Sequence, residues 1–321
     1  LCVLGCLRTS AQATADGYYK QAYDLYAAEK YEESLKAVNQ VIDVNPRYAS
    51  AYILRGNISF VREQDSAALA DYDKGLALDP RDPNAWARRG MLKWYTKDRK
   101  GAFSDLSMAI KRGSKEADVF LYRGWMYSDD HNERLAIKDY AVVKRLAPTN
   151  KHAWHNTGVS YERLGKKRAA LAQYNKEIKL APKDAAGWTA RGHIYSELKM
   201  FDKAIRDHQK AAELDPKSDS AWNGLAWAYH LKGDDDNNLK YVAKALEIDP
   251  KNANALDTRA NGLAAKGKFD EALADWAEAI KINAENPDFY KNRAAAYRSM
   301  KKFDLARADE AAYRRFSKAK R

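Results

Sequence analysis

The chain has 321 residues, of which 45% are hydrophobic and 31% are charged. Its 56 Lys and Arg residues against 44 Asp and Glu give a formal net charge of +12, and the excess is spread along the sequence. This balance favours acidic partners and would support weak binding to nucleic acid or an anionic membrane. After the first few residues, no segment approaches the length of apolar sequence that spans a bilayer.

The first residues form an apolar run, Leu1 to Leu7, which holds both cysteines and is followed by Ala11-Gln12-Ala13. An apolar run before an A-x-A sequence is typical of the end of a secretory signal peptide. We therefore expect residues 1–14 to be a truncated signal peptide or N-terminal tail, and the protein to be exported to a periplasm or secreted. Two alternatives stay open. Val3-Leu4-Gly5-Cys6 resembles a bacterial lipoprotein box, which would leave Cys6 lipidated, and an apolar start that is no signal would leave the protein in the cytoplasm.

From Ala15 onward the sequence repeats with a period of 34 residues, nine times, without an inserted or missing residue. The slices are 15–48, 49–82, 83–116, 117–150, 151–184, 185–218, 219–252, 253–286 and 287–320. A fixed period of this length indicates a helical solenoid, in which each unit must stack on its neighbours to bury its apolar face. We therefore expect one elongated all-α array.

Fixed positions of each slice take the same kind of side chain. Position 4 is aromatic in eight slices, position 8 is Gly or Ala in all nine, and position 11 is Tyr in five. This spacing lies on one face of an α-helix and places a large ring beside a notch. Position 20 is Ala in seven slices, which predicts the matching small surface on a second helix. Pro at position 32 of six slices ends that second helix.

These residues resemble the tetratricopeptide repeat, and the resemblance covers residues 15 to 320. It implies a pair of antiparallel helices, A and B, in each slice, and a right-handed superhelical solenoid of nine helix-turn-helix repeats whose inner groove is lined mainly by helix A. It implies little about the partner. Some members of the family clamp acidic C-terminal tails with Lys and Asn at set positions of three consecutive repeats, and no three consecutive slices supply that set.

Two positions vary together along the chain. Position 7 is Arg in six slices, and position 23 is Asp in the same six and in no other. We predict an ion pair from helix A to helix B in each of these repeats, partly buried beside the notch. The alternative is a ladder of anion-binding arginines in the groove. The six pairs are Arg55–Asp71, Arg89–Asp105, Arg123–Asp139, Arg191–Asp207, Arg259–Asp275 and Arg293–Asp309.

No catalytic or cofactor-binding motif is found: the sequence lacks a P-loop, a Rossmann glycine fingerprint, a G-x-S-x-G elbow and an H-E-x-x-H pair. We expect no enzyme and no cofactor, and we look for function on the stripe of helix A at positions 2, 5, 9 and 12. In the first four slices this stripe is apolar and aromatic, with Tyr19, Tyr23, Tyr26, Ile53, Phe60, Met91, Trp94, Leu121 and Trp125. In slices 5 to 7 it is mainly polar, with His152, His155, Glu162, His193, Ser196, Asn223, Trp227 and His230.

The apolar sector is expected to anchor side chains of a protein or peptide partner, and the polar sector to orient the partner's backbone or charges. Alternatively, the N-terminal rings pack between neighbouring helices A. The histidines would be sensible metal ligands, but we favour solvated or partner-facing histidines and predict no metal site. The acidic run Asp234 to Asp236 fits the start of a helix better than a calcium loop.

Nucleic-acid binding is the alternative function, because other helical repeat arrays read RNA and the net charge is +12. The groove positions hold few Arg or Lys residues, which disfavours it. The sequence does not indicate an oligomeric state.

Overall fold

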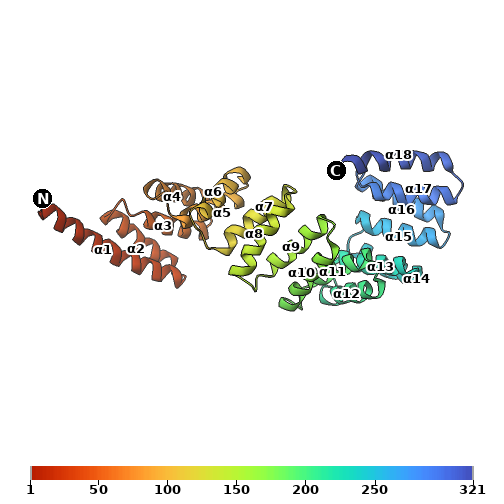
Figure 1. Ribbon diagram of the computed structural model, residues 1–321, viewed down its shortest axis with the longest axis horizontal. Helices are drawn as coiled ribbons and strands as arrows, with labels where there is room; N and C mark the ends of the chain where they lie inside the picture. Colours follow the sequence, from red (N-terminus) through yellow and green to blue (C-terminus); the bar gives the residue numbers. More distant parts are fainter. Residues whose placement is uncertain (1, 320–321) are drawn as a thin grey trace. The chain divides into compact units, whose positions relative to one another are not determined.

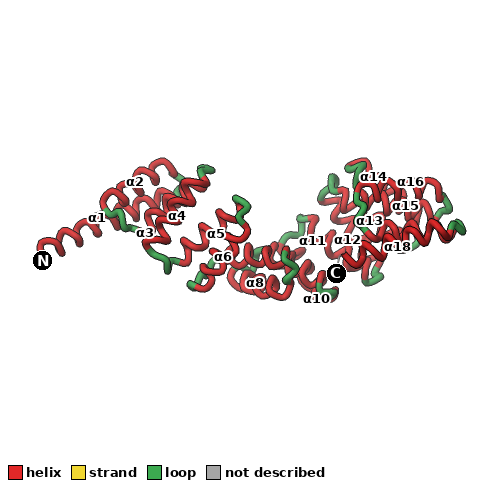
Figure 2. Tube along the Cα trace, turned by 90° about the horizontal axis from the view of Figure 1, so that it is seen from above, coloured by secondary structure: helices red, strands yellow, loops and turns green. Residues whose placement is uncertain are grey.

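The computed structural model describes the backbone of residues 2–319 and the side chains of residues 12–318. Every regular element in this part is an α-helix and none is a strand, which confirms the expected all-α class (Figures 1 and 2). The helices are α1 (Cys2–Ala27), α2 (Tyr31–Val44), α3 (Ala49–Val61), α4 (Asp65–Leu78), α5 (Pro83–Tyr95), α6 (Arg99–Lys111), α7 (Ala117–Asp129), α8 (Glu133–Leu146), α9 (Lys151–Arg163), α10 (Lys167–Leu180), α11 (Ala185–Glu197), α12 (Phe201–Leu214), α13 (Asp219–Lys232), α14 (Asp235–Ile248), α15 (Ala253–Ala265), α16 (Phe269–Ile282), α17 (Pro287–Ser299) and α18 (Phe303–Ala319).

The helices alternate as A and B along the chain. The odd-numbered helices from α3 to α17 begin at residues 49, 83, 117, 151, 185, 219, 253 and 287, the first residues of the expected slices. Helices α1 and α2, α3 and α4, and the later pairs pack together as helix-turn-helix units (Figure 1). A hydrogen bond of 3.0 Å between His155 of α9 and Glu177 of α10 connects these two helices. The side chains of residues 1–11, which include the apolar run of the expected leader and Cys6 of the lipoprotein alternative, lie outside the described residues.

Contacts divide the chain into two compact units, Leu1–Ala153 and Trp154–Arg321. In the first unit α1, α3, α5 and α7 contact one another in order, and in the second unit α11, α13, α15 and α17 do so. We call the surface formed by the odd-numbered helices of a unit its A face. Within the described residues, no helix combines the length and the apolar character needed to cross a bilayer.

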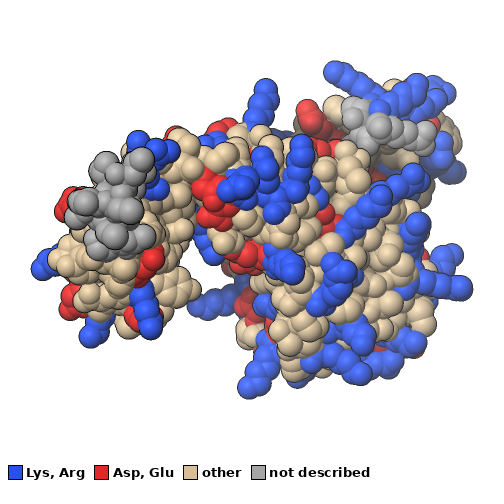
Figure 3. Space-filling view, turned by 60° about the vertical axis from the view of Figure 1, so that its left-hand side comes forward, with Lys and Arg blue, Asp and Glu red and all other residues tan. Residues whose placement is uncertain are grey.

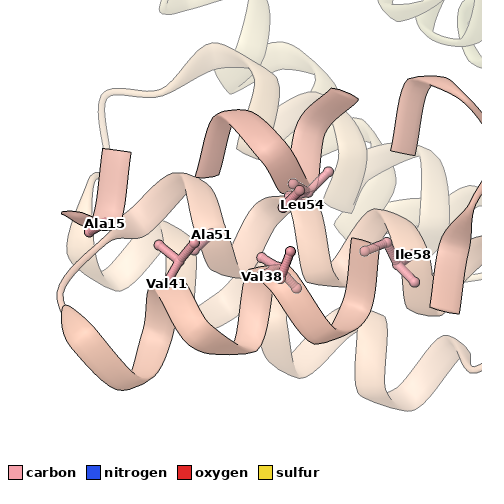
Figure 4. Packing of buried hydrophobic residues seen from close by; sticks show 8 residues of the cluster. Ala15, Val38, Val41, Ala51, Leu54 and Ile58 are labelled. Atoms are coloured by element: carbon pink, nitrogen blue, oxygen red, sulfur yellow. The ribbon is translucent and has the colours of Figure 1, made fainter. Parts of the chain in front are cut away.

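The small residue at position 8 makes room for a large side chain at position 24 of helix B. A Cβ atom on Gly124 would lie 2.5 Å from Cε1 of Tyr140, and one on Gly158 would lie 2.5 Å from Cε1 of Tyr174. Both tyrosines are fully buried. Where α2 packs on α3 the fully buried residues are aliphatic, and Figure 4 shows Val38 and Val41 of α2 beside Leu54 and Ile58 of α3. Burial of such side chains contributes about 1.5–3 kcal/mol each.

Most of the rings at position 4 are half-buried rather than enclosed. The indole N–H groups of Trp86, Trp188 and Trp222 donate to the carbonyl oxygens six residues earlier, at 2.9, 3.1 and 3.0 Å. Those carbonyls belong to the prolines at position 32 of the preceding repeat. The ring and the proline therefore act together, since the ring fastens the turn between two repeats to helix A.

All six predicted ion pairs are confirmed. In each, Nε and Nη2 of the arginine donate to the two carboxylate oxygens of the aspartate, and the closest N–O distances are 2.6 to 2.8 Å. The aspartate side chains are only 4 to 12% exposed. Because buried carboxylates hold these guanidinium groups, the arginines do not form a ladder of free anion sites.

Three of the arginines also reach the preceding repeat. Nη1 of Arg55 donates to Asn39 at 3.0 Å, that of Arg89 to Asp73 at 2.5 Å, and that of Arg191 to Asn175 at 2.7 Å. Each of these partners lies at position 25 of the repeat before. One guanidinium group thus connects three helices, a link between repeats that the pairing of positions 7 and 23 did not predict.

The turn between helices A and B contains a left-handed residue at position 15 of every slice. Its φ is 59° at Glu63, 66° at Lys97 and 70° at Gly165, and it is also positive in the other six slices. Only three of the nine residues are glycine. The left-handed backbone conformation costs a residue other than glycine about 1–2 kcal/mol. In the six slices without glycine at position 15, packing of the two helices must therefore impose this conformation.

Candidate functional site

Two adjoining hollows, of about 410 and 290 Å³, open on the A face of the first unit. Tyr23 and Tyr26 of α1, Asn57 of α3 and Arg88 of α5 line both. Residues spaced by three or four along a helix share one face, so each odd-numbered helix presents a short column of side chains here. We call the two hollows together the tyrosine groove.

A series of aromatic rings borders the tyrosine groove. The ring centroids of Phe60 and Tyr95 are 5.7 Å apart, those of Tyr95 and Tyr122 are 6.0 Å apart, and those of Tyr122 and Trp125 are 5.0 Å apart. The hydroxyl groups of Tyr95 and Tyr122 share a hydrogen bond of 2.5 Å. The rings are still open to solvent, since Tyr23 is 55%, Phe60 37% and Tyr95 56% exposed. Such exposed aromatic surface is typical of protein interfaces.

Two polar side chains stand among these rings. The hydroxyl of Tyr72 donates to Oδ1 of Asn57 at 2.8 Å, which leaves the amide nitrogen of Asn57 as its free donor. Burial raises the pKa of Tyr72, so this hydroxyl keeps its proton. Arg88 pairs with Glu116 at 3.2 Å, and their side chains are 41% and 30% exposed. A surface pair of this kind is worth about 0–1 kcal/mol, so a ligand carboxylate could replace Glu116.

The predicted apolar residues divide into two groups. Those that line the groove are Tyr19, Tyr23, Tyr26, Ile53, Phe60 and Met91. The other three do not line it: Leu121 is 5% exposed and belongs to the core, Trp94 lines a separate hollow of about 260 Å³ beside Arg99, and Trp125 packs on Tyr122. For Leu121, packing between neighbouring elements is the better interpretation.

Sequence reasoning did not select Asn57, Arg88, Tyr95 and Tyr122, which also line the groove. Arg88 and Tyr122 lie at position 6 of their slices and Tyr95 at position 13, four residues after positions 2 and 9. Helical periodicity places those positions on the same face, so a wider stripe would have included them. Asn57 lies at position 9 of the predicted stripe, but the prediction for the first four slices covers only apolar and aromatic residues.

The polar residues of slices 5 to 7 do not form a single site. Nδ1 of His155 lies 3.0 Å from both carboxylate oxygens of the buried Glu177, and this hydrogen bond raises the pKa of His155. Nδ1 of His230 lies 2.6 Å from Oδ1 of Asp235. Each of these two histidines therefore contacts a carboxylate of its own repeat. Asn223 has a buried Oδ1, and His152 is exposed.

The described residues contain no group of three or more His, Cys, Asp or Glu side chains placed to hold a metal ion. Asp234 is the N-cap of α14, where its carboxylate accepts the backbone N–H of Asn237 at 3.1 Å. This agrees with the interpretation of the acidic run as a helix start.

His193 and Trp227 do share a hollow. It measures about 420 Å³, lies on the A face of the second unit, and is also lined by Glu162, Ser196 and Glu197. We call it the acidic hollow. His193 is exposed, but protein surrounds it on most sides and this desolvation lowers its pKa. Glu162 and Ser196 lie on the predicted stripe, whereas Glu197 was not anticipated.

Models of the tetratricopeptide repeat match residues 19–86, 151–184, 185–218 and 219–252, and a model described as a TPR repeat matches residues 260–300. No curated protein matches the sequence significantly. The matched segments together make up more than half of the chain, and three of them coincide with whole slices.

Solved structures share the fold at low sequence identity. A tetratricopeptide repeat protein from Parabacteroides merdae is 14% identical with a TM-score of 0.59, over 77% of this chain and 98% of that one. The C-terminal part of a TPR repeat-containing protein from Cytophaga hutchinsonii is 17% identical with a TM-score of 0.58, over 75% and 98%. A chain of the APC/C hetero-tetramer Cut9-Hcn1 is 15% identical with a TM-score of 0.58, over 86% of this chain and 54% of that one.

These structures establish the fold alone, because all are below 25% identity. The repeat models add the family, whose members are protein-interaction repeats and generally non-catalytic scaffolds. With its helix pairs, its position-specific residues and the four matching models taken together, the chain belongs to the tetratricopeptide repeat family.

Proposed function

We propose that this chain is a non-enzymatic scaffold that binds an extended segment of a partner protein in the tyrosine groove. The observation that carries the proposal is the group of exposed rings, Tyr23, Phe60 and Tyr95, around a hollow of about 410 Å³ on the A face. Ligand sites commonly have volumes of about 300–1,000 Å³ and apolar walls with a few fixed polar groups. Membership of a family of interaction repeats supports the same function.

The groove also indicates the chemistry of the segment. Aromatic or aliphatic side chains of the partner would cover the rings of Phe60 and Tyr95, and a main-chain carbonyl would accept the free amide N–H of Asn57. An acidic side chain or carboxyl terminus would compete with Glu116 for Arg88. Such a segment needs no helix or strand of its own, because Asn57 and Arg88 contact backbone and charge rather than a folded surface.

Selection of peptides from a displayed random library, followed by calorimetry, tests the proposal. Rings at the centre of an interface often cost about 2 kcal/mol or more when truncated, so Phe60→Ala and Tyr95→Ala should each weaken the selected peptide about thirtyfold or more. Phe303→Ala is the matched control, because Phe303 on α18 is 58% exposed and lies in the other unit. Equal affinity for all four proteins would refute binding in the tyrosine groove.

Nucleic-acid binding would depend on the net charge of +12. Lys and Arg side chains are spread over the surface visible in Figure 3, with Asp and Glu between them, and do not gather into one band. In the tyrosine groove the only basic lining residue among those described is Arg88, which is paired. Binding of a polynucleotide that persists at about 0.3 M salt would revive this function, because nonspecific phosphate contacts weaken steeply with salt.

We also propose that the protein is exported, on the basis of the apolar run and the Ala11-Gln12-Ala13 sequence. Fractionation of the cells that produce the protein naturally tests this. Recovery with the cytosolic fraction, with residues 1–14 retained, would contradict export, and a lipid attached to Cys6 would favour the lipoprotein alternative.

A further inference from the structure

The acidic hollow of the second unit contains one carboxylate, that of Glu162, that forms no ion pair with a Lys or Arg of the described residues. Glu162 at the end of α9 is half-buried, and its one hydrogen bond comes from the hydroxyl of Tyr174 to Oε2 at 3.1 Å. Burial is the main reason why the pKa of Glu162 is raised, and the nearby charge of Glu197 adds to it, whereas the hydrogen bond from Tyr174 and the charges of His155 and Arg163 act in the opposite direction.

Glu197 supplies a second carboxylate at the mouth of the hollow. It pairs with Lys167 at 3.2 Å, but the two side chains are 47% and 39% exposed, so water screens this contact. His193, which lines the same hollow, has a lowered pKa because of desolvation and adds no positive charge near neutral pH. Lys199 lies at the rim and is exposed. The interior of the hollow is thus acidic.

A second, independent observation points to a ligand. Ser196 lines the hollow and is 7% exposed, and its Oγ is buried without a hydrogen-bond partner. A buried hydroxyl left without a partner is costly, and native sites commonly satisfy such groups with a ligand or water. Because this Oγ is covered, the hydroxyl marks an unsatisfied polar group in the wall of the hollow, on α11, rather than a contact that is already open to a ligand.

The remaining wall is aromatic and apolar, with Trp227 and Leu231 of α13 and Phe201 of α12. An indole ring attracts a cation placed over its face, and a planar guanidinium group stacks on such a ring better than an ammonium group does. A guanidinium group also matches the two oxygens of a carboxylate with two parallel donors. A carboxylate beside an indole ring fits the cationic, planar head of arginine better than it fits an anion or an aliphatic side chain.

We infer that the acidic hollow binds an arginine side chain of a partner protein, held between the carboxylate of Glu162 and the ring of Trp227. This inference rests on the proposed function, because the arginine is taken to belong to a bound protein. It adds a second point of recognition that differs in chemistry from the tyrosine groove: the groove selects apolar side chains, and the acidic hollow selects a positive charge.

The probe for a test is N-acetyl-arginine amide, titrated into the full chain while the indole N–H signals are followed by NMR. The signal of Trp227 is assigned from the spectrum of Trp227→Phe. We expect a saturable shift of this signal with a dissociation constant on the order of millimolar, since the probe has few atoms. N-acetyl-citrulline amide, which has the same shape without the charge, should give no saturable shift, and N-acetyl-lysine amide should bind more weakly than the arginine probe.

Glu162→Gln keeps an acceptor for the hydroxyl of Tyr174 but removes the charge, and should weaken the arginine probe at least about tenfold. Glu197→Gln changes an exposed side chain, cannot disturb the core, and should weaken the probe about threefold. Glu247→Gln on α14, also exposed, is the matched control and should bind as the unaltered chain does. Equal binding of the arginine and citrulline probes, or unchanged binding of the arginine probe by both Glu162→Gln and Glu197→Gln, would overturn the inference.

The two proposals fail in distinguishable ways. Phe60→Ala should leave the titration with the arginine probe unchanged, because Phe60 lies in the first unit. If the probe binds as expected while Phe60→Ala and Tyr95→Ala leave peptide binding unchanged, the tyrosine groove is refuted and the acidic hollow stands. If the peptide experiment succeeds and the probe does not bind, the acidic hollow alone is refuted.

Discussion

The ion pair between Arg123 and Asp139 allows a test of what the repeated Arg–Asp motif contributes to stability. Both nitrogen–oxygen contacts are 2.8 Å, and the side chains are 17% and 7% exposed. Arg123 is the best choice of the six, because Arg55, Arg89 and Arg191 also bond to the preceding repeat, Arg259 is more exposed at 37%, and Arg293 lies in the last of the nine repeats. Burial alone would lower the pKa of Arg123, but the hydrogen bonds and charge of Asp139 outweigh it and raise that pKa.

The substitutions are Asp139→Ala, Arg123→Leu and the double change. The chain itself supplies precedents, since Ala37 occupies the aspartate position of the first repeat and Leu225 the arginine position of the seventh. Removal of one partner of a buried pair leaves an uncompensated charge and costs about 3–5 kcal/mol. We expect about 3 kcal/mol for Asp139→Ala, because Arg123 keeps some access to water, and about 4 kcal/mol for Arg123→Leu, because the carboxylate does not.

The double change should cost only about 1–2 kcal/mol, since it leaves no buried charge. The coupling free energy, which is the sum of the two single costs minus the cost of the double change, is then about 5 kcal/mol, and it is at least about 2 kcal/mol if water enters the single variants. Hydrogen–deuterium exchange of the amides of α7 and α8 measures the local free energy of opening, which suits a repeat array that need not unfold in one step. Additive single effects, with a coupling below about 0.5 kcal/mol, would refute the reasoning.

Three further predictions concern single repeats. His208 is fully buried with both ring nitrogens unpartnered, and burial holds its pKa well below 6.5, so the unfolded chain binds a proton below pH 6.5 that the folded chain does not. The stability of the unaltered chain therefore decreases as the pH is lowered through that range. In urea denaturation, the free energy of unfolding of His208→Leu minus that of the unaltered chain should rise by about 1.4 kcal/mol from pH 7.5 to pH 5.5; a difference that stays constant would contradict this. Gly165→Ala, at a φ of 70°, should lower stability by about 1 kcal/mol, and an unchanged melting temperature would contradict it. Gly124→Ala places a Cβ 2.5 Å from Tyr140 and should cost about 1–3 kcal/mol, whereas Gly17→Ala meets nothing within 4 Å and should gain up to about 1 kcal/mol; equal effects in the same assay would show that the notch is not filled as described.

Much of the fold could be predicted because the repeat compares the chain with itself. The ion pairs are the clearest case, since Arg and Asp at positions 7 and 23 vary together across the slices. The left-handed residue at position 15 could not be found in this way. Its identity changes from Glu63 to Lys97 to Gly165, because the two packed helices determine the backbone angle and the side chain points to solvent.

The site was predicted less completely than the fold. The choice of positions 2, 5, 9 and 12 found Tyr23 and Phe60, but it also selected Leu121, because position 5 turns toward the core in that repeat. Periodicity gives the direction of a side chain only to within about one helical position, and the exposure of a residue beside the core depends on the size of its neighbours. Arg88 and Tyr122, at position 6, lie just outside the chosen stripe for the same reason.

The framework and the two proposed sites are connected through position 24 of helix B. Glycine at position 8 allows a tyrosine to fill the notch, and the hydroxyl of that tyrosine then reaches the A face. In the second repeat Tyr72 holds the amide of Asn57, and in the fifth Tyr174 holds the carboxylate of Glu162. Tyrosine at position 24 thus orients an amide in the tyrosine groove and a carboxylate in the acidic hollow. The chemistry of each site depends on which A-face residue the hydroxyl contacts.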